Sequence, residues 1–484
     1  MTSSIHKNLF FGLVALSPIV FYLVKFSDLF LLIEYRQWVN GSDVWGPASG
    51  FLTYSFSPTS NFSRSFSLLV ASVFGATCDA SIECHNLLNI ALLGGTSLGI
   101  YVVANRLTAW RFQALAALAS VAFLLSHPAI DAVGWQATLH DRVGALLCIW
   151  TVYIFVCFDQ KKRWWEIVLV NFVGLIAIVA TYNSKEATWP VIGSLALLVL
   201  SRQLTEFPAN AATLIEAVVR TGSLLLLPGM YVVYKVTTYA TQFANSGYVN
   251  HAFGGNRLKN LNSFVGYHFN LSPKSAGVDF YFAAFLGMFV VGIVLSYAFA
   301  KNKDERTAAN LTVWAVVSFL AFIAVPSGTL YGSPFYLVVP AVFLTLAIFF
   351  LLARAASASA APRSMTFAVA AVFLLHQVVA FKSLLPEYEP MITFSQNVRK
   401  LLKLVRTEQG DVTILYPSKN HRGYMFFDPP EGRALEAFAG SAAKRLDIRS
   451  VRNPLMQPPS ERGATYWLDE NLAVMRRVEG PSGG

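Results

Sequence analysis

The fold is decided by an uncharged stretch, FYLVVPAVFLTLAIFFLLA, at residues 335–353. A helix that crosses the apolar core of a bilayer needs roughly 17–25 residues of this kind. Comparable stretches recur, and we predict eleven spans, at 8–26, 84–105, 110–126, 141–157, 164–181, 188–201, 218–235, 280–299, 309–326, 335–353 and 365–382. The apolar stretch 66–75 is too short to cross and is expected at the interface. The sequence therefore predicts an all-α polytopic membrane protein.

The composition agrees with this fold class. Hydrophobic residues make up 55% of the 484 residues and charged residues only 13%, whereas a soluble protein carries ~25% charged residues. The net charge of +10 is interpreted as a sign of membrane orientation, because Lys and Arg concentrate in cytoplasmic loops. A secreted disulfide scaffold, a disordered chain and a soluble nucleic-acid binder are excluded.

The distribution of basic residues predicts the orientation. With eleven alternating spans, the segments on the side of the N-terminus contain twelve Lys and Arg residues, whereas the short loops opposite contain only Lys185. Positively charged loops stay in the cytoplasm, so we expect the N-terminus inside and the C-terminus outside. Because the loops lack long insertions, we favour a bacterial inner membrane with a periplasmic site; in a eukaryote the corresponding membrane is that of the endoplasmic reticulum.

The outer side carries most of the remaining chain, in loops 27–83 and 236–279 and in the tail 383–484. The tail contains 14 of the 37 basic and 12 of the 27 acidic residues, which predicts a soluble domain separate from a membrane domain of residues 1–382. Its pattern indicates a small α/β fold with a disordered end. The expected elements are a strand at Asp411–Tyr416, a helix at Arg433–Arg445 and a hairpin formed by Thr465–Leu468 and Leu472–Val478.

The four cysteines do not have the spacing of a zinc site. Cys78 and Cys84 share the first outer loop, where a disulfide between them is possible in an oxidising compartment, although the sequence does not establish it. Cys148 and Cys157 lie in a predicted span and are expected to be buried.

Ionisable residues gather at the predicted outer boundary of the membrane, where such residues suggest a functional site. They lie at four places in the sequence, of which the third is the densest. These places are marked by Asp28; by Arg64; by His127 and Asp131 with His140, Asp141 and Arg142; and by Lys185 with Glu186. Each also has a purely structural explanation, such as a helix cap for Asp28, an interfacial anchor for Arg64 or a snorkelling pair for Lys185 and Glu186. The high density of ionisable residues between His127 and Arg142 favours a site that lines a cavity.

The order of these motifs resembles that of the polytopic GT-C glycosyltransferases, in particular the branch of the protein O-mannosyltransferases with tetratricopeptide repeats and their bacterial relatives. The resemblance covers about residues 1–200. It rests on Asp28 after the first span, Phe62-Ser63-Arg64, His85 with Asn89, His127-Pro128-x-x-Asp131-Ala132-Val133-x-Trp135 with Asp141, and Ser184-Lys185-Glu186.

The chain departs from the family pattern at several positions. Leu29 follows Asp28 where family members often have a second acid, Ser65 follows Arg64 in place of proline, and Asp131 replaces a glutamate. Leu139 stands where the family has an arginine, and no tetratricopeptide repeat is visible. The resemblance therefore does not assign the sugar or the acceptor.

The resemblance implies transfer of a sugar from a polyprenyl-phosphate donor to a hydroxyl of a glycan, a lipid-linked glycan or a protein, on the outer face of the membrane. Asp28 would act as general base for that hydroxyl, with inversion in one displacement. The phosphate would be held mainly by Lys185 and Arg142, and more weakly by Arg64.

The remaining residues of the site would support this chemistry. Glu186 would position Lys185, whereas Asp131 and Asp141 would orient Arg142, His140 or the sugar; His127 completes the substrate-binding set. The phosphate has a second pKa of about 6 and leaves without a general acid. Neither a cofactor nor a divalent metal is expected, because no second acid adjoins Asp28.

Two other functions compete with this interpretation. A polysaccharide polymerase or O-antigen ligase would use loop 236–279, with Arg257, Tyr267 and His268, although the loop lacks a dense set of arginines. A transporter or flippase would have charged residues in the middle of its spans and helices broken by Gly or Pro, whereas here the ionisable residues cluster at the outer boundary. A scaffold that keeps the fold without activity is a further alternative.

Overall fold

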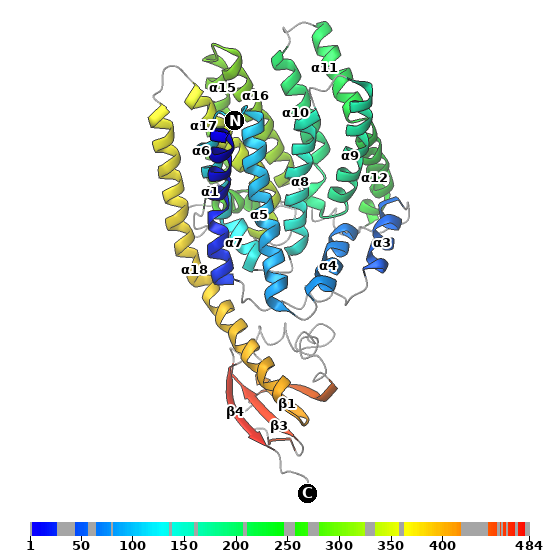
Figure 1. Ribbon diagram of the computed structural model, residues 1–484, viewed down its shortest axis with the longest axis vertical. Helices are drawn as coiled ribbons and strands as arrows, with labels where there is room; N and C mark the ends of the chain where they lie inside the picture. Colours follow the sequence, from blue (N-terminus) through cyan, green and yellow to red (C-terminus); the bar gives the residue numbers. More distant parts are fainter. Residues whose placement is uncertain are drawn as a thin grey trace.

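Apolar stretches of this length fold into helices, because in lipid a helix satisfies its backbone hydrogen bonds within itself. The structure is a computed structural model (Figure 1), a bundle of helices with a small sheet at one end. It describes residues 2–26, 44–56, 64–78, 81–134, 138–158, 163–206, 211–245, 257–269, 280–324, 334–357, 363–417, 444–452, 455, 458–460, 463–469 and 473–479.

The helices of the described residues mostly coincide with apolar stretches of the sequence. They are α1 (Thr2–Phe26), α3 (Trp45–Phe56), α4 (Ser65–Cys78), α5 (Ile82–Leu107), α6 (Gln113–Leu124), α7 (His127–Gly134), α8 (Leu139–Phe158), α9 (Trp164–Tyr182), the short η2 (Glu186–Thr188), α10 (Val191–Glu206), α11 (Ala211–Leu224), α12 (Leu226–Asn245), α14 (Arg257–His268), α15 (Phe280–Ala298), α16 (Lys303–Ala324), the short η4 (Pro334–Leu337), α17 (Val338–Ser357) and α18 (Arg363–Thr407).

The prediction of a polytopic helical membrane protein is confirmed, but the prediction of eleven spans is wrong. Among the described residues, seven helices are long and apolar enough to cross a membrane, or nine if each of two bent helix pairs is one span. The predicted spans 188–201 and 280–299 correspond to apolar helical segments, Val191–Gln203 and Ala284–Ala298, that are shorter than the others. Counting apolar residues therefore overestimated the number of complete crossings.

The two bent pairs each contain a proline close to the bend. Helices α6 and α7 meet at 48°, and Pro128 is the second residue of α7. Helices α11 and α12 meet at 73°, and Pro228 lies in the first turn of α12. Proline lacks a backbone N–H and disfavours helical geometry at the residue before it, which explains why a continuous apolar stretch becomes two helices.

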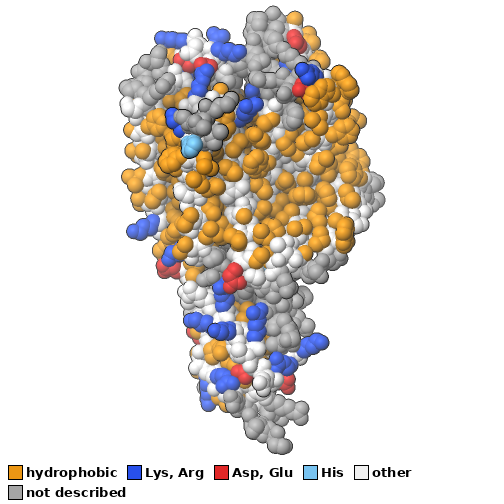
Figure 2. Space-filling view, in the orientation of Figure 1, with side chains coloured by type: hydrophobic (Ala, Val, Ile, Leu, Met, Phe, Trp, Pro, Cys, Tyr) orange, Lys and Arg blue, Asp and Glu red, His pale blue; other side chains and the backbone are white. Residues whose placement is uncertain are grey.

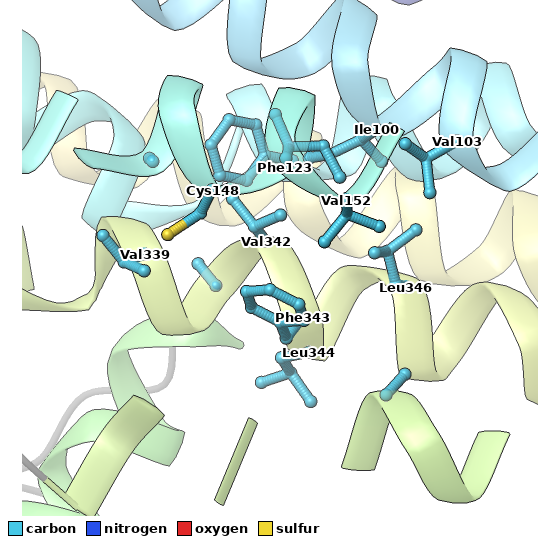
Figure 3. Packing of buried hydrophobic residues seen from close by; sticks show 14 of the residues in the cluster. Ile100, Val103, Phe123, Cys148, Val152, Val339, Val342, Phe343, Leu344 and Leu346 are labelled. Carbon is cyan, nitrogen blue, oxygen red and sulfur yellow. The ribbon is translucent and has the colours of Figure 1, made fainter. Parts of the chain in front are cut away.

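Helix α17, which contains most of the stretch 335–353, lies at the centre of the bundle. Its side chains from Val338 to Leu346 are all almost completely buried, as expected for a helix that is apolar on every side. Figure 3 shows Val342 and Leu346 of α17 among Ile100 of α5, Phe123 of α6 and Val152 of α8. The outer face of the bundle is a broad hydrophobic band, with Lys and Arg mostly above and below it (Figure 2).

The tail forms a four-stranded sheet in the order β2-β1-β3-β4. Strands β2 (Leu446–Val451) and β3 (Ala464–Leu468) run parallel to β1 (Val412–Pro417), and β4 (Val474–Glu479) is antiparallel to β3. The predicted strand and the predicted hairpin are therefore confirmed, whereas most of the predicted helix at Arg433–Arg445 lies outside the described residues.

Helix α18 connects the bundle to the sheet without interruption (Figure 1). The expected division between residues 382 and 383 thus falls within one helix, and the separation into two domains stays a prediction. The C-terminal part of α18 buries Val398, Leu401 and Val405 in a hydrophobic cluster shared with the sheet. Near the start of the chain, a disulfide joins Cys78 at the end of α4 to Cys84 at the start of α5.

The close packing of α5 against α8 can be tested with two glycines. A methyl group at Gly99 would lie 2.6 Å from Ile149 Cγ2, whereas one at Gly193 would have no atom within 4 Å. We expect Gly99→Ala to lower the free energy of unfolding in detergent by about 1–3 kcal/mol, because a filled core resists extra atoms. Gly193→Ala should stabilise α10 by roughly 0.5–1 kcal/mol. Equal effects of the two substitutions on stability would contradict the packing described here.

Candidate functional site

The segment between α9 and η2 brings several predicted site residues together at the end of the bundle nearest the sheet. The backbone N–H of Phe66, in the first turn of α4, donates to the carbonyl of Asn183 at 2.9 Å. The hydroxyl of Ser67 donates to the carbonyl of Ser184, also at 2.9 Å. These bonds attach the start of α4, and with it Arg64, to the segment that carries Lys185.

Lys185 forms a buried ion pair with Asp141, in the first turn of α8. Its Nζ lies 3.3 Å from Asp141 Oδ2, and the side chains are only 8% and 2% exposed. The ammonium group also lies over the ring of Tyr336 in η4, 5.2 Å from the ring centre. Desolvating two ions costs several kcal/mol each unless their contact and further polar partners compensate, so this pair fixes α8 against the corner between α9 and η2.

Arg142 is completely buried beside this pair. Its Nη2 donates to Asn89 Oδ1 of α5 at 3.0 Å, and its Nη1 donates to Thr138 Oγ1 at 3.2 Å. Asn89 belongs to the His85–Asn89 motif, and His85 is also buried. Both bonds go to neutral groups and orient the guanidinium.

His140 links these residues into one cluster. Its side chain is buried, and Arg64, Arg142 and Lys185 all lie within electrostatic range of it. We call Arg64, His140, Asp141, Arg142 and Lys185 the cationic cluster. Its side chains include three permanent cations, Arg64, Arg142 and Lys185, and the carboxylate of Asp141. Lys and Arg in such a setting suit a phosphate, through charge-assisted hydrogen bonds.

Asp131 and His127 belong to a second group, on α7. Tyr388 of α18 donates to Asp131 Oδ1 at 3.0 Å, and the ring of His127 meets the ring of Tyr267 edge-on at 5.1 Å. The ring of Tyr388 also packs against Phe26, the last residue of α1, at 6.0 Å. The sequence indicated Asp131 and His127 but not Tyr388, because the residues of this hydrogen bond are 257 positions apart.

Some predicted site residues cannot be placed in this arrangement. Asp28, the proposed base, and Trp135 lie outside the described residues, as do the side chains of Glu186 and Arg257. Among the residues that are described, no three His, Cys, Asp or Glu side chains gather as a metal site requires; the expectation of a metal-independent site still rests on the sequence.

Comparison with known proteins does not connect the chain to a known family. No protein-family model matches the chain, and no curated protein is similar to it in sequence. The functional argument therefore depends on the residues of the cationic cluster and on their surroundings.

The burial of the ion pair leads to a prediction about stability. Asp141→Asn should lower the free energy of unfolding by roughly 3–5 kcal/mol, because it leaves a buried ammonium group without its counter-ion. Asp304 pairs with Arg111, and both side chains are more than half exposed; Asp304→Asn should cost less than about 1 kcal/mol. Chemical unfolding of both variants in the same detergent measures the difference, and a similar small cost for both would show that Lys185 and Asp141 are not buried together.

Proposed function

We propose that the chain is an inverting membrane glycosyltransferase of the GT-C type. It transfers a sugar from a polyprenyl-phosphate donor to a hydroxyl of a glycan, a lipid-linked glycan or a protein, on the outer face of a bacterial inner membrane. The observation that carries the proposal is the cationic cluster, in which Arg142 and Lys185 are buried at one end of an apolar bundle. Buried cations are costly in such a protein and are typical of a functional site.

The chemistry of the donor matches these surroundings. A polyprenyl phosphate has an apolar tail, which stays in the bilayer, and an anionic phosphate, which requires cations at the boundary between lipid and water. Arg142 is oriented by Asn89 and Thr138, so that little conformational entropy remains to be lost when it binds an anion. Asp141 holds Lys185 in place and lowers the cost of its burial when no donor is bound.

The displacement then requires one further group, a base for the acceptor hydroxyl. We assign this role to Asp28, on the basis of its position after the first span. The phosphate departs with the electron pair of the bond to the sugar and needs no proton, while the acceptor oxygen attacks from the opposite face and inverts the configuration. Phe26, two residues before Asp28, packs against Tyr388, whose hydroxyl donates to Asp131. We assign Tyr388 and Asp131 to the sugar or acceptor side of the reaction.

Substitutions at the two proposed sites should have different kinetic effects. Asp28→Asn should lower kcat for sugar transfer by about 10²–10⁴-fold without changing the affinity for the donor, because a general base acts only in the transition state. Lys185→Met should raise KM for the polyprenyl-phosphate sugar roughly tenfold or more, through the loss of a charged contact. Both are measured with purified protein and a radiolabelled donor.

Matched variants separate function from folding. Lys235 is another buried lysine, and its Nζ donates to the Tyr54 carbonyl at 2.7 Å; Lys235→Met should leave KM for the donor unchanged. The double variant Asp141→Asn with Lys185→Met removes both charges of the buried pair, which is often tolerated, and should fold but bind the donor weakly.

Two outcomes would contradict the assignments. If Asp28→Asn keeps full transfer activity, Asp28 is not the base, and Glu34 or Asp43 becomes the candidate. If the folded double variant keeps full transfer activity, the proposed phosphate site is wrong.

A further inference from the structure

A second charged site lies at the end of the bundle opposite the sheet. Here the ends of α5, α10 and α17 and the start of α16 surround a cleft with a cavity volume of about 270 Å³. Among the described residues, its charged lining consists of Arg111, Arg202, Lys303 and Asp304, and its apolar lining includes Leu107, Phe112 and Leu311. The cleft shares none of these residues with the cationic cluster.

The charges of the cleft favour an anion. Among the described lining residues, three are cations and one is a carboxylate, Asp304, which is paired with Arg111. Arg202 is half-buried and Lys303 is exposed. Lys303 and Asp304 belong to the first turn of α16, where Glu305 and Asn302 already bond the backbone. The attraction for an anion therefore comes from the basic side chains rather than from the end of the helix.

The turn between α5 and α6 shapes one wall of the cleft. Ala109 and Trp110 have φ angles of 49° and 61°, and they are the only residues other than glycine with positive φ among those that the structure describes. This region is sterically unfavourable for residues with a Cβ atom. The ring of Trp110 packs edge-on against Tyr101 at 6.2 Å, which holds the turn so that Ala109 and Arg111 line the cleft.

We infer that this cleft binds the phosphate-bearing headgroup of an anionic membrane lipid. It lies where the helices of the bundle end, at the level expected for lipid headgroups, and basic pockets between helix ends favour such groups. A free phosphate would use the same cations, but the apolar part of the lining suits the start of an acyl chain. By the distribution of basic loops, this end is also the predicted cytoplasmic side, whose leaflet is rich in anionic lipid. The inference does not depend on the proposed transferase activity.

The test compares lipid binding by full-length variants. Native mass spectrometry of the purified protein, titrated with phosphatidylglycerol or with phosphatidylcholine, gives the affinity for each lipid. Arg202→Gln with Lys303→Gln should weaken phosphatidylglycerol binding about 25-fold, since each basic residue contributes about fivefold near a membrane surface, and should leave phosphatidylcholine binding unchanged. Arg306→Gln is the matched control, because Arg306 is an exposed cation of the same helix that does not line the cleft.

A variant that should bind phosphatidylglycerol more tightly separates the loss of a binding site from a folding defect. Asp304→Asn removes the carboxylate and releases Arg111, so it should strengthen phosphatidylglycerol binding several-fold. An equal loss of binding in Arg306→Gln, or no gain in Asp304→Asn, would overturn the inference, because attraction would then come from diffuse surface charge. Competition is measured with inorganic phosphate: if the ion at the same concentration displaces phosphatidylglycerol, the ligand is a soluble phosphate and the lipid assignment is wrong.

Discussion

Burying Lys185 with Asp141 costs several kcal/mol of desolvation for each ion, and much of the bundle end nearest the sheet is arranged around this pair. The contact requires α8 to begin where α9 ends. The start of α4 is attached to the same corner by the hydrogen bonds from Phe66 and Ser67. Once these helices meet, Arg142 is enclosed with its neutral partners. A single buried pair thus explains why residues from distant parts of the sequence share one site.

The apolar packing of the bundle makes this arrangement rigid. Helix α17 fills the centre, and its neighbours α5, α6 and α8 are the helices that carry or adjoin the polar residues of the site. The end of α18 also contributes, since Phe394 and Val398 share a hydrophobic cluster with Leu139 and Val143 of α8. An ion pair between Arg399 and Glu83, at 2.8 Å, joins α18 to the start of α5. These contacts attach α18, which leads to the sheet, to the end of the bundle that carries the cationic cluster.

The sequence predicted those features that depend on local composition. Apolar stretches indicated the helices, and alternation indicated β1 and the β3–β4 hairpin. The number of spans was wrong, because hydropathy registers neither the short length of the apolar helices at Val191–Gln203 and Ala284–Ala298 nor the bends beside Pro128 and Pro228. The pairing of Lys185 with Asp141 and of Tyr388 with Asp131 could not be predicted, since such contacts depend on how helices pack. The Cys78–Cys84 bridge spans only six positions, and proximity alone made it possible from the sequence.

The two charged ends of the bundle differ in how deeply their cations are buried, and this difference affects which anions each end can bind. In the cationic cluster, Arg142 and Lys185 are buried and held by neighbours, so their field is little screened by salt and their geometry is fixed before an anion arrives. In the opposite cleft, Arg111 and Lys303 are exposed, and salt screens them strongly. A buried, oriented pair of cations suits a reacting phosphate that must be held in one position. Exposed cations beside an apolar wall suit a headgroup that exchanges with the surrounding lipid, and the two sites that we propose therefore differ in character.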